Sequence, residues 1–183
     1  RKIYENNNHY FGDLSAILID NLPIWAELIS TPSNEISLLD KWDEKIDAII
    51  KGTLQQDVRS LSGVPSWMLT LMNKLLETTG KNYIDEIWKN LEVFFHGGVS
   101  FKPYKNEFKN IISNKNFKYY EVYNASEGFF GIQDLNDGRD LLLMLDYGVF
   151  YEFIEISESN NDEKIIDLTQ VKKGVNYAML ITT

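Results

Sequence analysis

The sequence predicts an α/β fold, in which a parallel sheet with covering helices is followed by a more antiparallel β portion. Strand-like and helical segments alternate between residues 58 and 128, which is the pattern of a parallel sheet. After residue 128 strand-like runs follow one another without a helix between them. The 183 residues are 44% hydrophobic and 13% aromatic, enough to bury a sizeable core.

Residues 1–57 are expected to be mainly helical. Apolar side chains at helical spacing predict helices over 10–30, interrupted at Pro23, and over 38–50, ended by Gly52.

Residues 58–128 predict a strand–helix–strand portion that would carry a ligand site. Pro65 or Ser66 is expected to open its most apolar helix, and Gly80 to stop it. The predicted elements are a strand over 58–62, a helix over 67–78, a short helix over 84–88, a strand over 91–96, a helix over 104–112 and a strand over 117–122.

Residues 129–183 predict a β-rich portion. An Asp137-Gly138 pair favours a tight turn, and an acidic, Asn-rich loop is expected over 157–164. The predicted strands cover 129–133, 141–145, 149–156 and 177–182. The four tryptophans lie on apolar faces and are expected in the core: Trp25, Trp42, Trp67 and Trp88.

Composition excludes several classes of function. The formal net charge of -9 argues against nucleic-acid and anionic-membrane partners, because both need a basic face. The sequence has no cysteine, which excludes disulfides and thiolate chemistry, and two histidines are too few for a histidine-rich zinc centre. No apolar run reaches the roughly 20 residues that cross a bilayer, and residues 1–8 lack the apolar stretch of a signal peptide. We therefore expect a cytoplasmic protein, and a first residue other than Met suggests a processed or cut chain.

The first candidate site is Phe95-His96-Gly97-Gly98-Val99, a predicted strand that ends in two glycines. Glycines let the backbone turn sharply and let a flat ligand lie against the main chain. A simple strand-to-helix turn, with His96 as a core residue, explains the same pattern.

The second candidate site is Tyr123-Asn124-Ala125-Ser126-Glu127-Gly128, at the end of the next predicted parallel strand. An aromatic ring, a hydroxyl and a carboxylate in one loop suit a base, a phosphate oxygen and Mg²⁺. A polar turn in which Tyr123 packs and Ser126 caps a helix is the plainer interpretation. A serine hydrolase is excluded in its usual order because no histidine follows His96, and the sequence contains no glycine-rich phosphate loop.

Four blocks of residues occur in a characteristic order along the chain. They are Gly63-Val64-Pro65-Ser66-Trp67, His96-Gly97-Gly98-Val99-Ser100-Phe101, the run from Tyr123 to Gln133, and the run from Met144 to Ile154. Together they resemble the bacterial branch of the Gretchen-Hagen (auxin-responsive promoter) family of acyl-acid amido synthetases. The resemblance covers residues from about 10 to 183 and implies an adenylate-forming enzyme, of the superfamily that includes firefly luciferase and acyl-CoA synthetases.

The resemblance implies a two-step, ATP-dependent ligation. A carboxylate attacks the α-phosphate of ATP to give an acyl-adenylate and pyrophosphate, and an amine, typically of an amino acid, then displaces AMP. Small-molecule acids and amines are the implied partners, and ATP and Mg²⁺ the implied cofactors.

The resemblance also implies roles for particular residues. Tyr123-Asn124-Ala125-Ser126-Glu127 matches the second nucleotide motif of the family, in which Tyr123 stacks on adenine, Ser126 contacts phosphate and Glu127 holds Mg²⁺. Gly97 and Gly98 would lie along adenine and the acyl group. Val99 and Phe129 would be walls of the acyl pocket.

The sequence departs from the family pattern at both ends. The first phosphate-loop motif, the third motif that binds ribose and the C-terminal domain are absent, so we expect residues 1–183 to be part of the large N-terminal adenylation domain. We assign no catalytic residue within the chain and expect it to be inactive alone. Transfer to a thiol acceptor such as CoA, or a non-catalytic binding module, remains an alternative. The sequence identifies neither the acid, the amine nor the oligomeric state.

Overall fold

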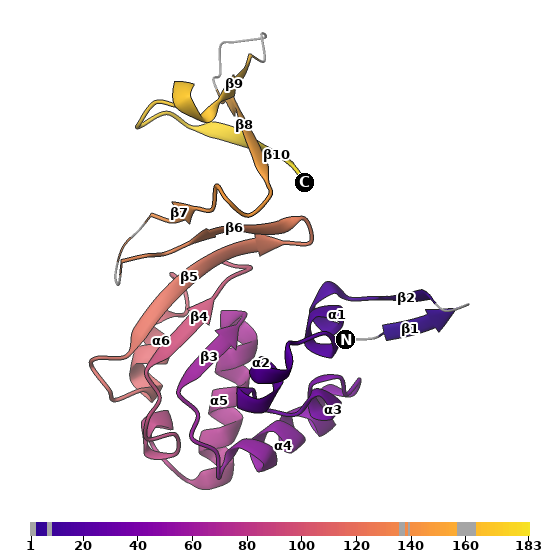
Figure 1. Ribbon diagram of the computed structural model, residues 1–183. Coiled ribbons are helices and arrows are strands. Elements are labelled where there is room, and N and C mark those ends of the chain that lie inside the picture. The colour runs from indigo at the N-terminus through magenta and orange to yellow at the C-terminus, as the bar shows by residue number, and fades with distance from the viewer. Residues whose placement is uncertain (1–2, 7–8, 136–137, 139, 157–163) are drawn as a thin grey trace. The chain divides into compact units, whose positions relative to one another are not determined.

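The main sheet of the protein has the strand order β3-β4-β5-β6-β7 in a computed structural model that describes residues 3–6, 9–135, 138, 140–156 and 164–183 (Figure 1). Strands β3, β4 and β5 pair in parallel, whereas β5, β6 and β7 pair antiparallel. This arrangement confirms the predicted fold class. The strands are β3 (Ser60–Gly63), β4 (Val93–His96), β5 (Lys118–Ala125), β6 (Gly128–Ile132) and β7 (Leu142–Leu143).

Two helices make the parallel connections, α5 (Pro65–Thr79) between β3 and β4 and α6 (Lys105–Ile111) between β4 and β5. Pro65 occupies the first turn of α5, where its missing N–H costs no hydrogen bond. Gly80 ends α5 in the left-handed conformation, with φ of 66°, and its N–H donates to the carbonyl of Leu76. The predicted short helix over 84–88 is one 3-10 turn, η1 (Ile84–Glu86).

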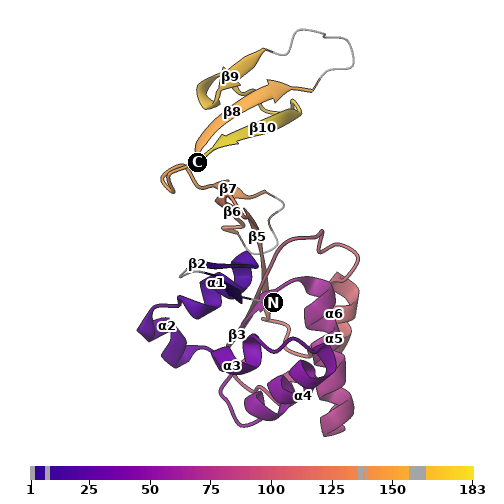
Figure 2. The same cartoon turned by 90° about the vertical axis from the view of Figure 1, so that its right-hand side faces the viewer.

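The larger hydrophobic core lies between the parallel strands and helices α5 and α6 (Figure 2). Phe94 of β4 and Phe108 of α6 are fully buried and stack with ring centroids 5.1 Å apart. Helix α4 (Trp42–Thr53) packs against α5 and contributes Ile46 and Ile50 to the same core. Helix α5 contributes Leu69, Met72 and Leu75.

The N-terminal segment differs from the predicted helical pattern in its first residues. A hairpin of β1 (Ile3–Asn6) and β2 (His9–Gly12) precedes the first helix. Tyr10 and Phe11, the first residues of the predicted helical pattern, therefore lie in β2. The predicted interruption at Pro23 is confirmed, because this residue separates two helices. The helices before α4 are α1 (Leu14–Asp20), α2 (Ile24–Ile29) and α3 (Asn34–Ser37).

Gly52 does not end its helix, contrary to the prediction. Helix α4 continues to Thr53, and the N–H of Leu54 still donates to the carbonyl of Ile50. The hydroxyl of Thr53 donates to the carbonyl of Ile49 at 2.8 Å, which supports the last turn. A glycine ends a helix only where the backbone turns left-handed, as at Gly80.

A second, antiparallel sheet has the order β10-β8-β9 and comprises β8 (Phe150–Glu155), β9 (Ile165–Asp167) and β10 (Tyr177–Thr182). The 3-10 turn η2 (Leu168–Gln170) follows β9. Around the second sheet and β6 lies a small buried core of Phe130, Val149, Tyr151 and Phe153. The predicted strand over 177–182 is confirmed. Asp137 of the predicted Asp137-Gly138 turn and most of the predicted loop over 157–164 lie outside the described residues.

The chain divides into two compact units within β5. Unit 1 contains Arg1–Glu121, and unit 2 contains Val122–Asp134 and Gly138–Thr183. The first half of β5 pairs with β4 and the second half with β6. In the part of the chain that the structure describes, no helix is both long and apolar enough to cross a membrane.

The expectation of four core tryptophans is correct only for Trp88. Trp88 is 2% exposed, and its indole N–H donates to the carbonyl of Thr53 at 3.1 Å. Trp25 and Trp67 are 68% and 56% exposed. Trp67 instead contacts Trp42 edge to face at 4.3 Å, so these rings cover each other at the surface. Helical spacing places a residue on a stripe without showing that another element covers it.

We predict that Leu75→Ala lowers the free energy of unfolding by about 2–5 kcal/mol, because Leu75 is fully buried in the larger core and its truncation leaves a cavity there. Leu28→Ala removes the same atoms from a side chain that is 81% exposed. This substitution is expected to change the free energy of unfolding by less than about 0.5 kcal/mol. Urea unfolding of both variants measures the difference, and equal effects would contradict the burial described for Leu75.

Candidate functional site

The predicted nucleotide motif forms the tip of a β-hairpin rather than a loop at the end of a parallel strand. Tyr123, Asn124 and Ala125 continue β5, and Ser126 and Glu127 form the turn that leads into β6. Ala125 pairs with Gly128, so only two residues lie between the paired strands. The prediction missed the antiparallel pairing because the sequence resembles both a helix cap and a tight turn.

A register shift in this hairpin lies between Tyr123 and Asn124. Tyr123 pairs with Gly131 and Asn124 pairs with Phe129, which leaves Phe130 as an extra residue on β6. Such bulges bend a strand and change the direction in which its side chains point. The ring of Tyr123 contacts the buried ring of Phe130 at 5.2 Å and stays 48% exposed. Tyr123 therefore presents an aromatic ring to solvent on a packed support.

Ser126 and Glu127 are exposed at the turn. Among the described residues, neither side chain has a hydrogen-bond or ion-pair partner within the structure, so the hydroxyl and the carboxylate are free to bind a ligand. The described part of the chain also contains no group of three or more His, Cys, Asp or Glu side chains that could hold a metal ion. Glu127 is thus an exposed carboxylate that belongs to no such group among the described residues.

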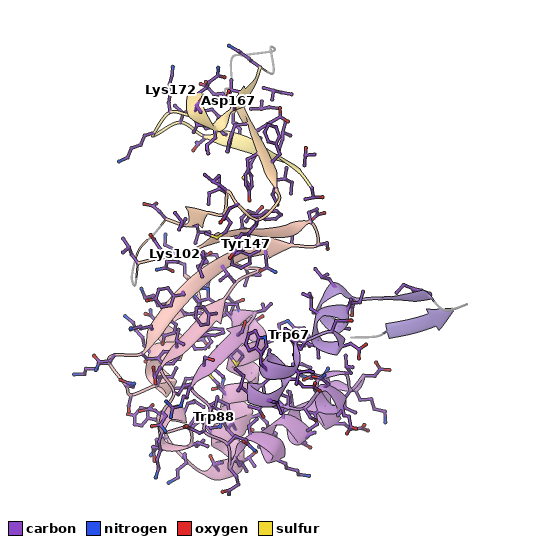
Figure 3. All side chains as sticks on the ribbon, in the orientation of Figure 1. Trp67, Trp88, Lys102, Tyr147, Asp167 and Lys172 are labelled. Atoms are coloured by element: carbon purple, nitrogen blue, oxygen red, sulfur yellow. The ribbon has the colours of Figure 1, made fainter. Side chains whose placement is uncertain are left out.

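Phe129, the predicted wall of an acyl pocket, lies on β6 and is half-buried. Its ring lies 6.0 Å from that of Tyr147, which is labelled in Figure 3 and is 59% exposed. The hydroxyl of Tyr151 donates to the carbonyl of Met144 at 3.0 Å and so anchors the segment that carries Tyr147. Tyr147 is not among the predicted site residues, although it belongs to the fourth block of the family resemblance.

Gly97, Gly98 and Val99 form the turn after β4, in unit 1. Gly98 has φ of 81°, a conformation that side chains rarely adopt. A Cβ atom at Gly98 would meet only the side chain of Val64, at 3.5 Å, so the backbone conformation and not crowding requires glycine. Val99 is 43% exposed.

His96 is the last residue of β4 and is 2% exposed. Its ring stacks on Phe101 at 4.0 Å, and its Nδ1 atom is buried without a hydrogen-bond partner among the described residues. Burial lowers the pKa of His96 from its ordinary 6.5 to about 4, so the ring is neutral at pH 7. The interpretation of His96 as a core histidine is consistent with this burial.

The hairpin therefore brings together six of the predicted site residues, and the turn after β4 holds three. Residues 123–127 and Phe129 belong to the first group, and residues 97–99 to the second. The contact between the rings of Tyr123 and Phe130 was not predicted, because the residue pattern does not indicate a β-bulge.

Comparison with protein families gives two matches. The model of the GH3 family N-terminal domain matches residues 2–117, and the model of the GH3 family central domain matches residues 142–183. The chain belongs to the GH3 family. The resemblance to the Gretchen-Hagen family is thereby confirmed, and the hairpin with Tyr123 and Glu127 lies between the two segments that match the GH3 models.

Two solved structures are similar to parts of this GH3 chain. One is a long-chain-fatty-acid-CoA ligase (FadD1) from Archaeoglobus fulgidus, with 14% identity, 66% of this chain covered, 25% of the ligase covered and a TM-score of 0.41. The other is CmiS6, with 14% identity, 60% of this chain and 26% of CmiS6 covered, and a TM-score of 0.38. The chain thus spans about a quarter of the length of each. A search of curated proteins found no significant match.

We predict that His96 makes the protein sensitive to acid. Its pKa is lower in the folded state than in the unfolded state, so its contribution to stability is present above pH 6.5 and is lost as the pH falls to about 4. Between pH 7 and pH 4 the free energy of unfolding should fall by roughly 3 kcal/mol more in the wild type than in His96→Phe. Urea unfolding at several pH values measures this difference, and parallel pH profiles for the two proteins would contradict it.

Proposed function

We propose that the protein is an ATP-dependent ligase that activates a carboxylic acid as an acyl-adenylate and joins it to an amine, typically that of an amino acid. The observation that carries the proposal is membership of the GH3 family, with matches over residues 2–117 and 142–183. The free hydroxyl and carboxylate at the hairpin tip, beside the exposed ring of Tyr123, support it.

The chemistry explains why such an enzyme uses ATP. A free carboxylate is a poor electrophile, and transfer of AMP to it creates an acyl carbon with a good leaving group. Pyrophosphate leaves in the first step as the carboxylate oxygen bonds to the α-phosphorus. The amine nitrogen then bonds to the acyl carbon, AMP departs and the nitrogen loses a proton.

In this proposal the hairpin binds the nucleotide. Tyr123 stacks on the adenine, and the hydroxyl of Ser126 donates to a phosphate oxygen. Asn124 and Ala125 belong to the same motif and hold these side chains at the tip of the hairpin. A rigid, supported aromatic ring suits this role because little side-chain freedom is lost when a base stacks on it.

Glu127 is the residue proposed to hold Mg²⁺. A single exposed carboxylate fits this ion, which commonly takes one or two protein carboxylates and completes its shell with water and substrate phosphates. When bound, Mg²⁺ neutralises phosphate charge that would otherwise repel an incoming carboxylate.

Gly97 and Gly98 are proposed to lie along the adenine and the acyl group, with Val99 and Phe129 as walls of the acyl pocket. The left-handed turn at Gly98 exposes main chain without a side chain, which suits close approach of a flat ligand. We likewise propose that residues 58–128 carry the nucleotide site, residues 1–57 the mainly helical part and residues 129–183 the β-rich part of an adenylation domain, in a cytoplasmic enzyme.

We predict that Glu127→Ala lowers acid-dependent ATP–pyrophosphate exchange by the full-length protein that contains this chain, by on the order of 100-fold. Exchange falls because Mg²⁺ would no longer be held by Glu127 to neutralise the charge on the phosphates of ATP. Glu155→Ala removes a carboxylate that is also exposed in unit 2, at the end of β8, and should leave exchange unchanged.

A panel of carboxylic acids is needed for that assay, because the acid is not known. Exchange that is equal in wild type and Glu127→Ala would exclude the metal role of Glu127. Absence of exchange with every acid would favour the alternative function, a non-catalytic binding module. Addition of amino acids or of CoA after the first step distinguishes amide formation from thioester formation.

We predict that residues 1–183 alone release no pyrophosphate from ATP with any acid. The chain holds one part of the proposed nucleotide site, and catalysis by positioning is lost when several positioning groups are missing together. A colorimetric pyrophosphate assay on the purified chain, beside the full-length protein, tests this, and acid-dependent release by the chain would contradict it.

A further inference from the structure

A hollow of about 620 Å³ lies in unit 1, between α6, the segment that follows it and the start of β5. Three lysines line it: Lys105 and Lys109 from α6 and Lys115 from the following segment. The amides of Asn110 and Asn114 and the hydroxyl of Ser113 add hydrogen-bonding groups, and Tyr83, Phe117 and Tyr119 form an aromatic wall. None of the residues of the candidate nucleotide site lines this hollow.

The segment from Lys102 to Lys118 is basic in an acidic protein. It contains five of the 18 basic residues of the chain and a single acidic residue, Glu107, whereas the whole chain has 27 acidic residues. Lys102, labelled in Figure 3, begins this segment. The positive charge is therefore local and opposite in sign to that of the molecule.

Two of the lysines of the hollow, Lys109 and Lys115, have no ion pair with a carboxylate among the described residues, in contrast to several basic residues elsewhere. Lys41, Arg59, Lys74 and Lys81 each lie within 4 Å of a carboxylate oxygen. Among the described residues, no carboxylate pairs with Lys109 or Lys115, although carboxylates are in excess. The nearby carboxylate of Asp85 accepts hydrogen bonds from the N–H and the hydroxyl of Ser113. Lys109 and Lys115 thus line the hollow without a paired carboxylate among the described residues.

Helix electrostatics explain only part of this arrangement. Lys109 lies in the last turn of α6, where the free carbonyl groups favour a cation. Lys115 lies beyond the helix and lines the same hollow. Two ammonium groups with free charge, next to amide donors, suit the oxygens of a phosphate group.

The size of the hollow indicates more than a free ion. Its volume falls within the roughly 300–1,000 Å³ of small-molecule sites, and a phosphate ion would fill a small part of it. The ring of Tyr83, 40% exposed, offers an apolar surface for the rest of a ligand. We propose that this hollow binds a small organic phosphate through Lys109 and Lys115. The proposal is independent of the ligase function.

Binding is tested by nuclear magnetic resonance titration of the 183-residue chain with ribose 5-phosphate, inorganic phosphate and ribose. Ribose 5-phosphate should shift the amide signals of residues 109–115, inorganic phosphate should do so more weakly, and uncharged ribose should not. Lys109→Gln with Lys115→Gln should weaken binding by about tenfold, because two exposed charge contacts are lost. Both side chains are exposed, so the fold should not change.

Lys172→Gln with Lys173→Gln is the matched control, since it removes the same charge from exposed positions in unit 2 (Lys172 is labelled in Figure 3). Full binding by this control, with loss in the Lys109 and Lys115 variant, supports the proposal. Equal weakening in both variants would show a general charge effect and overturn it. Absence of shifts at residues 109–115, or binding that is lost only in Ser126→Ala with Glu127→Ala, would also overturn it.

Discussion

The packing of Phe94 against α6 is the contact on which the parallel half of the protein depends. Phe94 is fully buried, and its ring meets those of Phe108 at 5.1 Å and Phe101 at 6.3 Å. These aromatic contacts fasten β4 to the helix that follows it, and burial of such rings is the largest favourable term available to a small domain. The stack of His96 on Phe101 extends the same cluster to the end of the strand. The turn at Gly97 and Gly98 is consequently held at both ends by buried aromatic residues.

The hairpin depends on a different principle, in which backbone pairing fixes the strands and leaves the tip open. Two turn residues connect Ala125 to Gly128, and the antiparallel ladder satisfies the backbone groups on either side. The side chains of Ser126 and Glu127 therefore contribute nothing to the fold that the described structure shows. Side chains that do not stabilise the fold are available to bind a ligand. The ring of Tyr123 differs, because one side packs on Phe130 and the other is exposed.

The sequence predicted the strand–helix alternation well because the signals are local. The apolar run of α5, between Pro65 and Gly80, contains its own start and stop. The sequence-based prediction was wrong where pairing between distant segments determines the structure. The end of β5 continues through Tyr123 because β6 returns to pair with it, and the exposure of Trp25 depends on which elements cover α2. The family resemblance predicts a nucleotide motif at residues 123–127, but the bulge beside Tyr123 is visible only in the register of two strands.

Unpartnered polar groups in this protein differ in what they cost. Glu127, Lys109 and Lys115 are exposed, and water solvates them, so leaving them unpaired destabilises nothing. Among the described residues the Nδ1 atom of His96 is buried without a hydrogen-bond partner, and such a group costs about 1–3 kcal/mol. An apolar ring would fit the stack on Phe101 without that cost. The exposed groups are thus explained by the absence of any penalty, and His96 is the position where the fold itself gives no reason for the residue present.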